Sequence, residues 1–490
     1  MGAVDCDVLV AGAGPTGVTL GLLLARNGVK TLVIDKEGDI YPLPRAAHID
    51  HEIVRIFQEL GLAETILSGC RSSARYDFLN ADGEILLRFE GMDRIGPGGW
   101  PAGNMVHQPS IEAALRAAAR DEANLGLKTR WAFVSCAETD DGVLSAIETP
   151  GGAQEVRSRF IVGADGARSP VRSAASIGFD DLGFDESWLV IDVLVHDASR
   201  LPDVNLQICN PARPTTCVLM GAGRHRWEFM AKPGETAEQM LDDAFIGELL
   251  APWNVEGAVT LERKAVYRFN AKVAEKWRKG RVLLAGDAAH LMPPFAGQGL
   301  CSGLRDAANL AWKLAAVLRG ADARLLDTYQ IEREPHVRAI IATAIMMGRT
   351  VCITDPDAAA ARDKQMIAAR AAGAAPDGAL RYPPFAAGCI AAGVGAGDYF
   401  PQPLSADARK LDDALGHGAW LISREAGSAG EACGLRSVSL NSPHLAPFRA
   451  SLDKWLAAHN ASAVLVRPDR YVFGMGEPNT LIAAWRAWAP

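Results

Sequence analysis

The chain has 490 residues, 49% of them hydrophobic and 22% charged, an ordinary globular composition long enough for two or three structural units. A formal net charge of −8 gives no electrostatic reason to expect nucleic acid or an anionic membrane as a partner. Nine cysteines without a C-x-x-C pair or metal-ligand spacing indicate reduced thiols and no metal site. The first predicted strand begins close to Met1 and no apolar run reaches the length of a membrane span, so we expect a cytoplasmic protein.

The first stretch with an evident role is a glycine-rich turn between a buried strand and a helix. An apolar run at 8–11 predicts a parallel strand, and a helical pattern follows at 18–26. The turn reads G-x-G-x-x-G: the first glycine allows the tight turn, the second lets a pyrophosphate approach the backbone, and the third permits close helix–strand packing. Free N–H groups at the start of the helix would bind the phosphates. The residues predicted to contact a dinucleotide here are Gly12, Gly14, Pro15, Thr16 and Gly17.

An acidic residue at the end of the next predicted strand completes this motif. The segment 30–34 predicts a strand, and Asp35 closes it, eighteen residues after Gly17. Lys36 comes next. A carboxylate at this position accepts hydrogen bonds from the ribose hydroxyls of adenosine. The sequence therefore predicts dinucleotide binding, with Asp35 and Lys36 among the binding residues. The alternative is an ordinary βαβ turn that binds nothing.

The chain then alternates between loops and short regular elements. The expected elements are a loop at 41–50, a helix at 52–60, a loop at 91–103, a helix at 110–119 and strand segments at 128–162. Ser110 is the predicted N-cap of its helix. The last of these strands runs into a small-residue turn that contains Asp165.

Residues 187–270 change character and predict a mostly antiparallel sheet inserted into the nucleotide-binding fold. Runs at 188–195, 204–208 and 226–230 alternate or are rich in β-forming residues, with few helical patterns between them. We expect the inner face of this sheet to hold the substrate. Arg226 could pair there with a substrate carboxylate; a solvent-facing charge is the alternative.

After the insert, the chain returns to the first domain with one more parallel strand. This strand ends at Gly286 and Asp287, and a Pro- and Gly-rich turn at 293–299 leads into an amphipathic helix at 300–318. For Asp287, as for Asp165, the alternative is a carboxylate at a strand end that only caps the next helix.

The remaining residues predict a surface helix and a further domain. An alanine-rich segment at 358–375 has few side chains to bury, and small residues at 386–397 mark a boundary. The tail beyond it mixes predicted strands with a helix at 451–458. Cys433 stands alone and dithiol chemistry needs two thiols, so we interpret the tail as a packing or dimerisation module.

The glycine fingerprint and the two later strand–turn–helix segments together resemble the three signatures of the group A flavoprotein monooxygenases, also called aromatic hydroxylases. In that family the segment like Gly286-Asp287 contacts the ribityl chain of FAD, and the segment like Asp165-Gly166 lies beside the pyrophosphate and affects nicotinamide binding. The residues like Arg45 and Gln108 also touch the flavin. The resemblance thus implies one non-covalently bound FAD.

The resemblance is closer to one subgroup, the 3-(3-hydroxyphenyl)propionate hydroxylases, and covers nearly the whole chain. The matching segments are 44–50, 99–101, 282–292, 298–299, 305–307, 309–314, 327–330, 455–460 and 467–470. The chain departs from the subgroup at His48, where the others usually carry Gly, and at His51, where they carry Asp. Because His48 should lie on the substrate side of the flavin, this departure bears on which substrate is bound.

The resemblance implies an α/β fold. We expect a Rossmann-like FAD-binding domain at 1–186 and 271–385, with a mainly antiparallel β substrate domain inserted at 187–270. The tail at 386–490 resembles the thioredoxin-like C-terminal domain of these hydroxylases.

The reaction that the resemblance implies has two halves. NADH or NADPH reduces FAD, and the reduced flavin adds O₂ to give a C4a-hydroperoxide that hydroxylates an electron-rich ring carbon. Pro294 would shape the oxygen pocket, and His48 is the candidate base that deprotonates the phenol, unless it is a loop histidine without a catalytic part. The start of the helix near 297 would stabilise the negative charge of the reduced flavin through its dipole and backbone amides. Its predicted contacts are Gly297, Gln298, Gly299 and Leu300.

As substrate we expect a phenol with a short acidic side chain, hydroxylated ortho to its hydroxyl group. A polyketide or antibiotic hydroxylase of the tetracycline or rifamycin type is the competing hypothesis, and a non-enzymatic flavin-binding module is the third. The sequence holds one Rossmann fingerprint, so the nicotinamide should bind transiently. It leaves open the choice between NADH and NADPH and whether the chain forms a homodimer.

Overall fold

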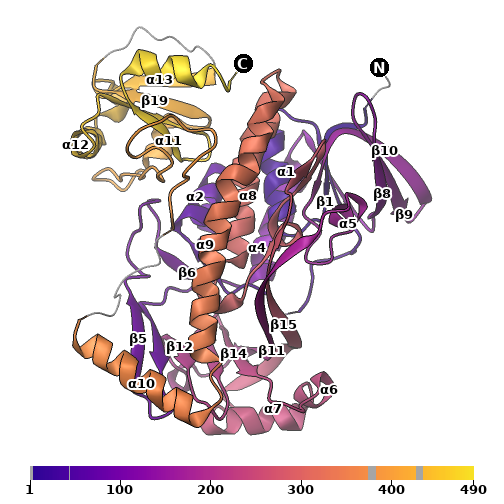
Figure 1. Cartoon of the computed structure of the whole chain (residues 1–490), viewed down its shortest axis with the longest axis vertical. Coiled ribbons are helices and arrows are strands. Elements are labelled where there is room, and N and C mark those ends of the chain that lie inside the picture. Colours follow the sequence, from indigo (N-terminus) through magenta and orange to yellow (C-terminus); the bar gives the residue numbers. More distant parts are fainter. Residues whose placement is uncertain (1–3, 44, 374–381, 426–433, 490) are drawn as a thin grey trace.

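The computed structural model describes residues 4–43, 45–373, 382–425 and 434–489. One large sheet lies in the upper part of Figure 1 and a second in the lower part, and the long helix α9 (Asp327–Val351) runs from the level of the first to that of the second. A smaller C-terminal sheet lies beside the first sheet's end of the molecule (Figure 1). Cys433 lies outside the described residues.

The first sheet has the glycine fingerprint at its centre. Its strand order is β16-β17-β10-β1-β2-β7; the strands from β17 to β7 are parallel, and β8 and β9 extend β10 as antiparallel strands. The strands are β1 (Cys6–Ala11), β2 (Thr31–Asp35), β7 (Leu125–Thr129), β8 (Ala132–Glu138), β9 (Val143–Thr149), β10 (Gly152–Gly163), β16 (Arg278–Lys279) and β17 (Val282–Leu284). β1 is buried almost throughout, which explains why its sequence is a continuous apolar run.

The second sheet is larger than the sequence predicts. Its order is β18-β15-β11-β14-β13-β12-β4-β5, and its neighbouring strands are antiparallel except for the β12–β4 pair. The strands are β4 (Arg75–Leu79), β5 (Ile85–Glu90), β11 (Phe179–Val195), β12 (Asn205–Ile208), β13 (Thr215–Leu219), β14 (Arg224–Met230), β15 (Val259–Ala274) and β18 (His290–Leu291). The sheet therefore extends beyond the predicted insert at 187–270. A parallel pair between strands that lie so far apart in sequence leaves no local signal.

Helices of the first domain pack around the parallel sheet. They include α1 (Pro15–Arg26), α2 (His51–Glu59), α3 (Ala63–Leu67), α4 (Gln108–Asp121), α5 (Pro170–Ala174) and α8 (Gly299–Leu318). α8 is buried nearly all round because α1, α9 and the turn after β17 pack against it. The predicted start of α4 at Ser110 is wrong: His107 is the N-cap, and Pro109 occupies the first turn, where its missing N–H costs nothing.

The second sheet has one covered face and one open face. Helices α6 (Ala237–Met240) and α7 (Asp243–Leu250) lie over one face (Figure 1), where Trp227 and Phe229 join a buried apolar cluster. Side chains alternate along a strand, so Arg226 and Glu228 of β14 point to the opposite face. Helix α10 (Pro356–Ala371) packs against β5 at the edge of this sheet.

The C-terminal part forms a separate sheet with the order β20-β19-β21-β22. β19 and β20 are parallel, and the other two pairs are antiparallel. The elements are α11 (Leu411–Leu415), β19 (Ala419–Ser423), β20 (Leu435–Ser439), α12 (Arg449–Ala458), β21 (Ala463–Val466), β22 (Val472–Gly476) and α13 (Pro478–Trp485). A stacked pair of indoles, Trp312 of α8 and Trp485 of α13, joins this part to the first domain. A thioredoxin-like fold for this part stays a prediction.

Among the described residues, no single helix is long and apolar enough to cross a bilayer. Two consecutive helical segments, 323–351 and 356–371, are together long and apolar enough to span a bilayer, but they are bent by 117° relative to each other. In the same part of the chain, no group of three or more His, Cys, Asp or Glu residues could hold a metal ion.

Candidate active site

One large cavity lies between the parallel sheet and the open face of the second sheet, with a volume of 2180 Å³. Small-molecule sites usually have about 300–1,000 Å³, so this volume suits a large cofactor together with a second ligand. The predicted site residues that line it are Gly12, Gly14, Pro15, Thr16, Asp35, Lys36, Arg45, His48, Gln108, Asp165, Arg226, Asp287, Pro294, Gly297, Gln298, Gly299 and Leu300. Gly17 and Gly286 do not line the cavity.

The fingerprint glycines each meet a different steric requirement. Gly12 has a φ of +105°, and a Cβ there would lie 2.2 Å from the Ala164 carbonyl oxygen. A Cβ on Gly17 would lie 1.9 Å from the Gly12 oxygen, so this glycine brings α1 against the turn. Around Gly14 the space is open, and this residue caps α1 without any side-chain hydrogen bond. The backbone amides at the start of α1 are therefore accessible from the cavity.

Asp35 ties the end of β2 to the glycine turn. Its Oδ2 accepts a hydrogen bond from the Ala13 amide at 2.7 Å, and its Oδ1 accepts one from the Glu37 amide at 2.8 Å. Arg116 reinforces this corner by donating to the Ala13 carbonyl oxygen at 3.1 Å. The carboxylate that the sequence assigns to a ribose thus also holds the turn in shape.

The two later aspartates differ in their local roles. Asp165 accepts a hydrogen bond from the Val171 amide in the first turn of α5, although Ser169 is the N-cap of that helix, so one oxygen has the structural role that the alternative hypothesis gave it. Its other oxygen, Oδ1, is buried with no partner among the described residues, and burial raises the pKa of the carboxyl. Asp287 caps nothing: it lines the cavity, and no described residue donates to its carboxylate. Both turns therefore present an unpaired carboxyl oxygen.

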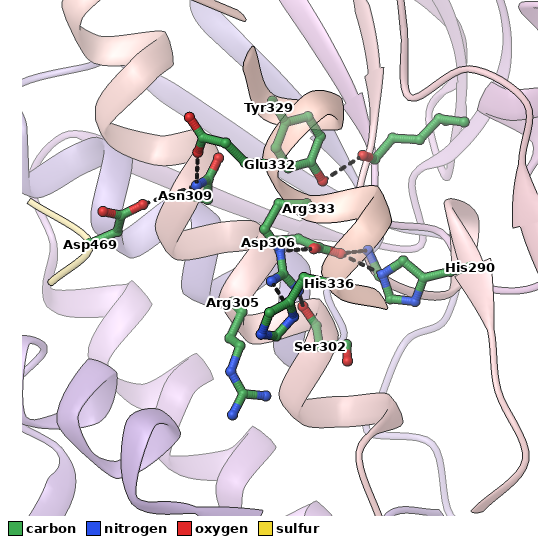
Figure 2. Close-up of polar contacts among 12 residues, drawn as sticks. His290, Ser302, Arg305, Asp306, Asn309, Tyr329, Glu332, Arg333, His336 and Asp469 are labelled. Carbon is green, nitrogen blue, oxygen red and sulfur yellow. Dashed lines mark hydrogen bonds and ion pairs between the residues drawn. The ribbon is translucent and has the colours of Figure 1, made fainter. Parts of the chain in front are cut away.

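A buried carboxylate on α8 holds the turn that carries Asp287. Asp306 accepts hydrogen bonds from the Gly286 amide at 3.0 Å, His290 Nε2 at 2.6 Å and Arg333 Nε at 2.9 Å. Figure 2 shows Asp306 between the His290 and Arg333 side chains. Burial opposes ionisation of Asp306, but the two facing side chains lower its pKa, so the carboxylate is charged. This network fixes the turn from behind the cavity wall.

The N-terminus of α8 opens into the cavity through Gln298 and Gly299. Arg305, about two turns further into the helix, donates to Gln298 Oε1 at 3.0 Å and is itself held by Asp50 and Glu52 at 2.6 Å each. Because Oε1 is bound in this way, the Gln298 amide orientation is fixed. Its Nε2 is buried without an acceptor in the part of the chain that the structure describes. It is a free hydrogen-bond donor at the positive end of the helix.

His48 lies beside this helix start, on the short strand β3 (His48–Asp50), which pairs with β6 (Gly103–Met105). Its Nδ1 is 3.4 Å from the Gly297 carbonyl oxygen, and its Nε2 is buried with no partner among the described residues. Burial lowers the pKa of the imidazole, with Asp50 opposing the shift. A neutral ring that donates from Nδ1 leaves Nε2 as a proton acceptor, on a residue that lines the cavity.

Two further predicted contacts are already engaged with protein groups. Gln108 accepts from the Ala46 amide at 2.9 Å and donates to Glu112 at 2.7 Å, so it anchors the loop before β3. Arg226 is neither solvent-facing nor free: its side chain is buried and pairs with Asp192 at 2.6 Å. The solvent-facing alternative for Arg226 is therefore wrong.

Comparison with known proteins identifies the family. The family model described as FAD binding domain matches residues 5–344, and the HcaD C-terminal domain matches 441–489. A probable NADH-specific resorcinol 4-hydroxylase of Rhodococcus jostii (strain RHA1) is 40% identical over 96% of this chain and 92% of its own. The chain belongs to the group A flavoprotein monooxygenases. A 3-(3-hydroxy-phenyl)propionate/3-hydroxycinnamic acid hydroxylase of Mycolicibacterium gilvum (strain PYR-GCK) is 34% identical over 96% and 88% of the two chains.

Solved structures agree with this monooxygenase in fold. Aklavinone-11 hydroxylase, in complex with FAD and aklavinone, matches with a TM-score of 0.78 over 99% of both chains at 24% identity. The flavin-dependent monooxygenase PieE, in complex with FAD and substrate, matches with a TM-score of 0.80 over 99% of this chain and 100% of its own at 23% identity. At such identities the likeness concerns the fold alone.

The residues of this monooxygenase fit FAD. Open space at Gly14 and the uncapped start of α1 suit the pyrophosphate, and the unpaired Asp287 carboxylate suits ribityl hydroxyls. The free Gln298 Nε2 and the first amides of α8 are donors for the flavin ring. The geometry thus supplies a phosphate site, a hydroxyl acceptor and ring donors within one cavity.

Replacing Asp287 with alanine should weaken FAD binding. A hydrogen bond to a charged acceptor contributes about 1.5–3 kcal/mol, so the dissociation constant should rise by roughly 10- to 150-fold. Asp287→Asn, which keeps an acceptor but no charge, should fall between this variant and the wild type. The measurement is the FAD content after purification and a titration of the apoprotein with FAD. An Asp287→Ala protein with unchanged affinity would contradict the assignment.

Sequence reasoning missed one side chain on the substrate side of the monooxygenase. Glu228 lines the cavity two residues after Arg226, on the same face of β14. The signal was present, because the segment 226–229 alternates between charged residues and buried aromatic residues. The Asp306 network left no such pattern, because its members come from separate elements.

Proposed function

We propose that this monooxygenase uses NADH and O₂ to hydroxylate a small phenol ortho to its hydroxyl group. The observation that carries the proposal is the unpaired Nε2 of His48, a residue that lines the same cavity as the start of α8 and the open face of the second sheet. A neutral imidazole at this place can take the proton of a phenol, and the resulting phenolate is electron-rich at its ortho carbons. The two curated relatives are named for phenolic compounds, which supports this substrate class.

The chain's own residues would do three things in this reaction. Bound FAD would supply the electron transfer from NADH and the activation of O₂. The start of α8, with Gln298 and Gly299, would stabilise negative charge on the flavin ring. Pro294 would exclude water beside the ring, and His48 would hold the phenol proton on Nε2.

Two finer points of the proposal concern the nicotinamide and the substrate. NADH is preferred in the proposal because the relative from Rhodococcus is named NADH-specific. The relatives include both a hydroxylase named for a neutral diphenol and one named for a phenolic acid, so their names do not decide whether the substrate carries the acidic side chain that the sequence predicts. A polycyclic substrate is the competing hypothesis.

The test is substrate-stimulated oxidation of NADH by the FAD-loaded enzyme. A panel would contain resorcinol, 3-(3-hydroxyphenyl)propionate and a polycyclic phenol, with product identified by mass spectrometry. We expect a small phenol to accelerate NADH oxidation and to gain one oxygen atom ortho to its hydroxyl. Stimulation by the polycyclic phenol alone would favour the competing hypothesis, and stimulation by none of them would refute the proposal.

A further inference from the structure

Two cross-strand rows on the open face of the second sheet meet the cavity. In the first row, Asp192 of β11 lies opposite Arg226 of β14 on one side and Arg263 of β15 on the other. In the next row, two residues along β14, Glu228 lies between Val190 and Thr216. Directly opposed side chains on one sheet face are in contact range, so each row forms a local electrostatic unit.

The first row is internally paired. Arg226 binds both oxygens of Asp192, at 2.6 and 3.1 Å, and Arg263 binds the same carboxylate. The third guanidinium nitrogen, Nη1, donates to the Arg45 carbonyl oxygen at 2.5 Å. Burial opposes ionisation of Asp192, but the two arginines lower its pKa, so it is charged. The unit therefore carries two positive charges and one negative charge.

Glu228 is the unsatisfied group of the second row. Its nearest charged neighbour is Arg226, whose Nη1 is 3.6 Å from Oε1, and no described residue donates a hydrogen bond to it. The hydroxyls beside it point elsewhere: Thr216 and Tyr76 both donate to Gln207 Oε1, at 2.9 and 3.0 Å. Glu228 is only 7% exposed, and burial raises the pKa of its carboxyl. Glu228 lines the cavity, so a ligand there can supply the hydrogen-bond donor that no described residue provides.

We propose that Glu228 is the specificity-determining residue for the substrate: it binds a second, uncharged hydroxyl group on the phenol ring and disfavours phenols that carry a carboxylate. This inference rests on the proposed function and names the substrate class of the same site. A ring hydroxyl both donates and accepts, so it satisfies the Glu228 carboxyl directly. The substrate is then a diphenol, whose first hydroxyl faces His48 and whose second faces the sheet.

The charges around Glu228 also favour a neutral substrate. With Glu228 ionised, the two arginines are balanced by Asp192 and Glu228, and the group of four is neutral. A substrate carboxylate would add an unbalanced buried charge, so its entry would require Glu228 to bind a proton. A neutral hydroxyl carries no such requirement. The pocket therefore favours the diphenol over the phenolic acid.

The test compares resorcinol with 3-(3-hydroxyphenyl)propionate on the FAD-loaded wild type and on Glu228→Gln. Calorimetric dissociation constants and kcat/KM are measured for both compounds. The wild type should prefer resorcinol. Because a charge-assisted hydrogen bond is roughly twice as strong as a neutral one, Glu228→Gln should lower kcat/KM for resorcinol by about tenfold. The same variant should bind the acid more tightly than the wild type does, since the opposing carboxylate is gone.

Two other variants test the length of the side chain at this position and the effect of removing a carboxylate outside the cavity. Glu228→Asp keeps the charge but retracts it by one methylene, so it should lose resorcinol affinity and still reject the acid. Glu262→Gln is the matched control: this carboxylate lies on β15, pairs with Arg224 and does not line the cavity. It should leave the preference unchanged.

The outcomes distinguish the inference from the proposed function. A wild type that prefers the acid, or a Glu228→Gln variant that changes both compounds equally, would overturn the role of Glu228 while a hydroxylated product upholds the proposed function. If neither phenol stimulates NADH oxidation, the proposed function fails. Calorimetry then still decides whether Glu228 discriminates between the two compounds.

Discussion

Replacing His48 with alanine should slow ring hydroxylation by roughly 10²–10⁴-fold while NADH is still oxidised in the presence of the phenol. The unpaired Nε2 of His48, beside the start of α8, is the proposed acceptor for the phenol proton. Without it the ring is not activated, and the oxygen consumed should appear as H₂O₂. The measurement is product formed per NADH oxidised, together with peroxide yield.

A second variant distinguishes proton transfer from positioning. Glutamine at this position can still donate to the Gly297 carbonyl oxygen but cannot take a proton, so His48→Gln should remain uncoupled. If glutamine restores the product yield, His48 only orients the substrate. If alanine itself keeps the wild-type yield, the base has to be sought on the second sheet, where Glu228 is the first candidate.

The pH profile offers an independent check on His48. Burial lowers the pKa of this imidazole below the ordinary value of 6.5, and a base is active in its unprotonated form. The acid limb of the kcat/KM profile should therefore fall below pH 6.5, so that activity is retained where an exposed histidine would already be protonated. A limb above pH 6.5 that disappears in His48→Gln would contradict the lowered pKa.

The parts of the site that could be predicted from the sequence are those built from adjacent residues. The glycine turn, the strand and helix around it and Asp35 form one continuous segment, and each glycine has a local steric reason that any βαβ unit shares. The turn with Asp287 is likewise continuous. Local patterns indicate such units because the hydrogen bonds and packing that define them are also local.

What could not be predicted depends on contacts between distant segments. The β4–β12 pair brings Tyr76 beside the inserted strands. Nothing in the sequence of 75–79 predicts a partner strand more than a hundred residues away. Arg226 was interpreted from its own strand alone, so its pairing with Asp192 on the neighbouring strand was missed. Buried ion pairs of this kind leave only single charged residues in the sequence, which resemble surface charges.

The strongest of these hidden contacts joins the first domain to the C-terminal part. Glu332 of α9 accepts hydrogen bonds from Lys313 of α8, from Arg467 beyond β21 and from Asn309, each at 2.7 Å. Figure 2 shows Glu332 with Asn309, and Asp469 on the other side of that amide. The Cys389 amide donates to the remaining oxygen at 2.7 Å. The Glu332, Lys313 and Arg467 side chains are all fully buried.

Glu332 is charged in spite of its burial. Burial alone would raise its pKa, but Arg467 and Lys313 outweigh that effect and hold the pKa at about 2, below the ordinary value of 4.5. A carboxylate with a lowered pKa in the folded state contributes stability that is fully present above pH 4.5. That contribution should be lost progressively as the pH falls from 4.5 toward 2. Acid titration of the unfolding midpoint should show the loss in the wild type and not in Glu332→Ala.

Replacing Glu332 with alanine should lower the free energy of unfolding by about 3–5 kcal/mol, because it leaves Lys313 buried without its counter-charge and Arg467 paired with Asp469 alone. Glu334→Ala is the matched control: it lies two residues further along α9, pairs with the part-exposed Arg338, and should cost less than about 1 kcal/mol. Urea unfolding followed by indole fluorescence gives both values. Glu332→Gln keeps one of the two acceptor oxygens, so it should lie between alanine and wild type and remains measurable if alanine prevents folding. Equal midpoints for Glu332→Ala and Glu334→Ala would show that this ion pair does not hold the two parts together.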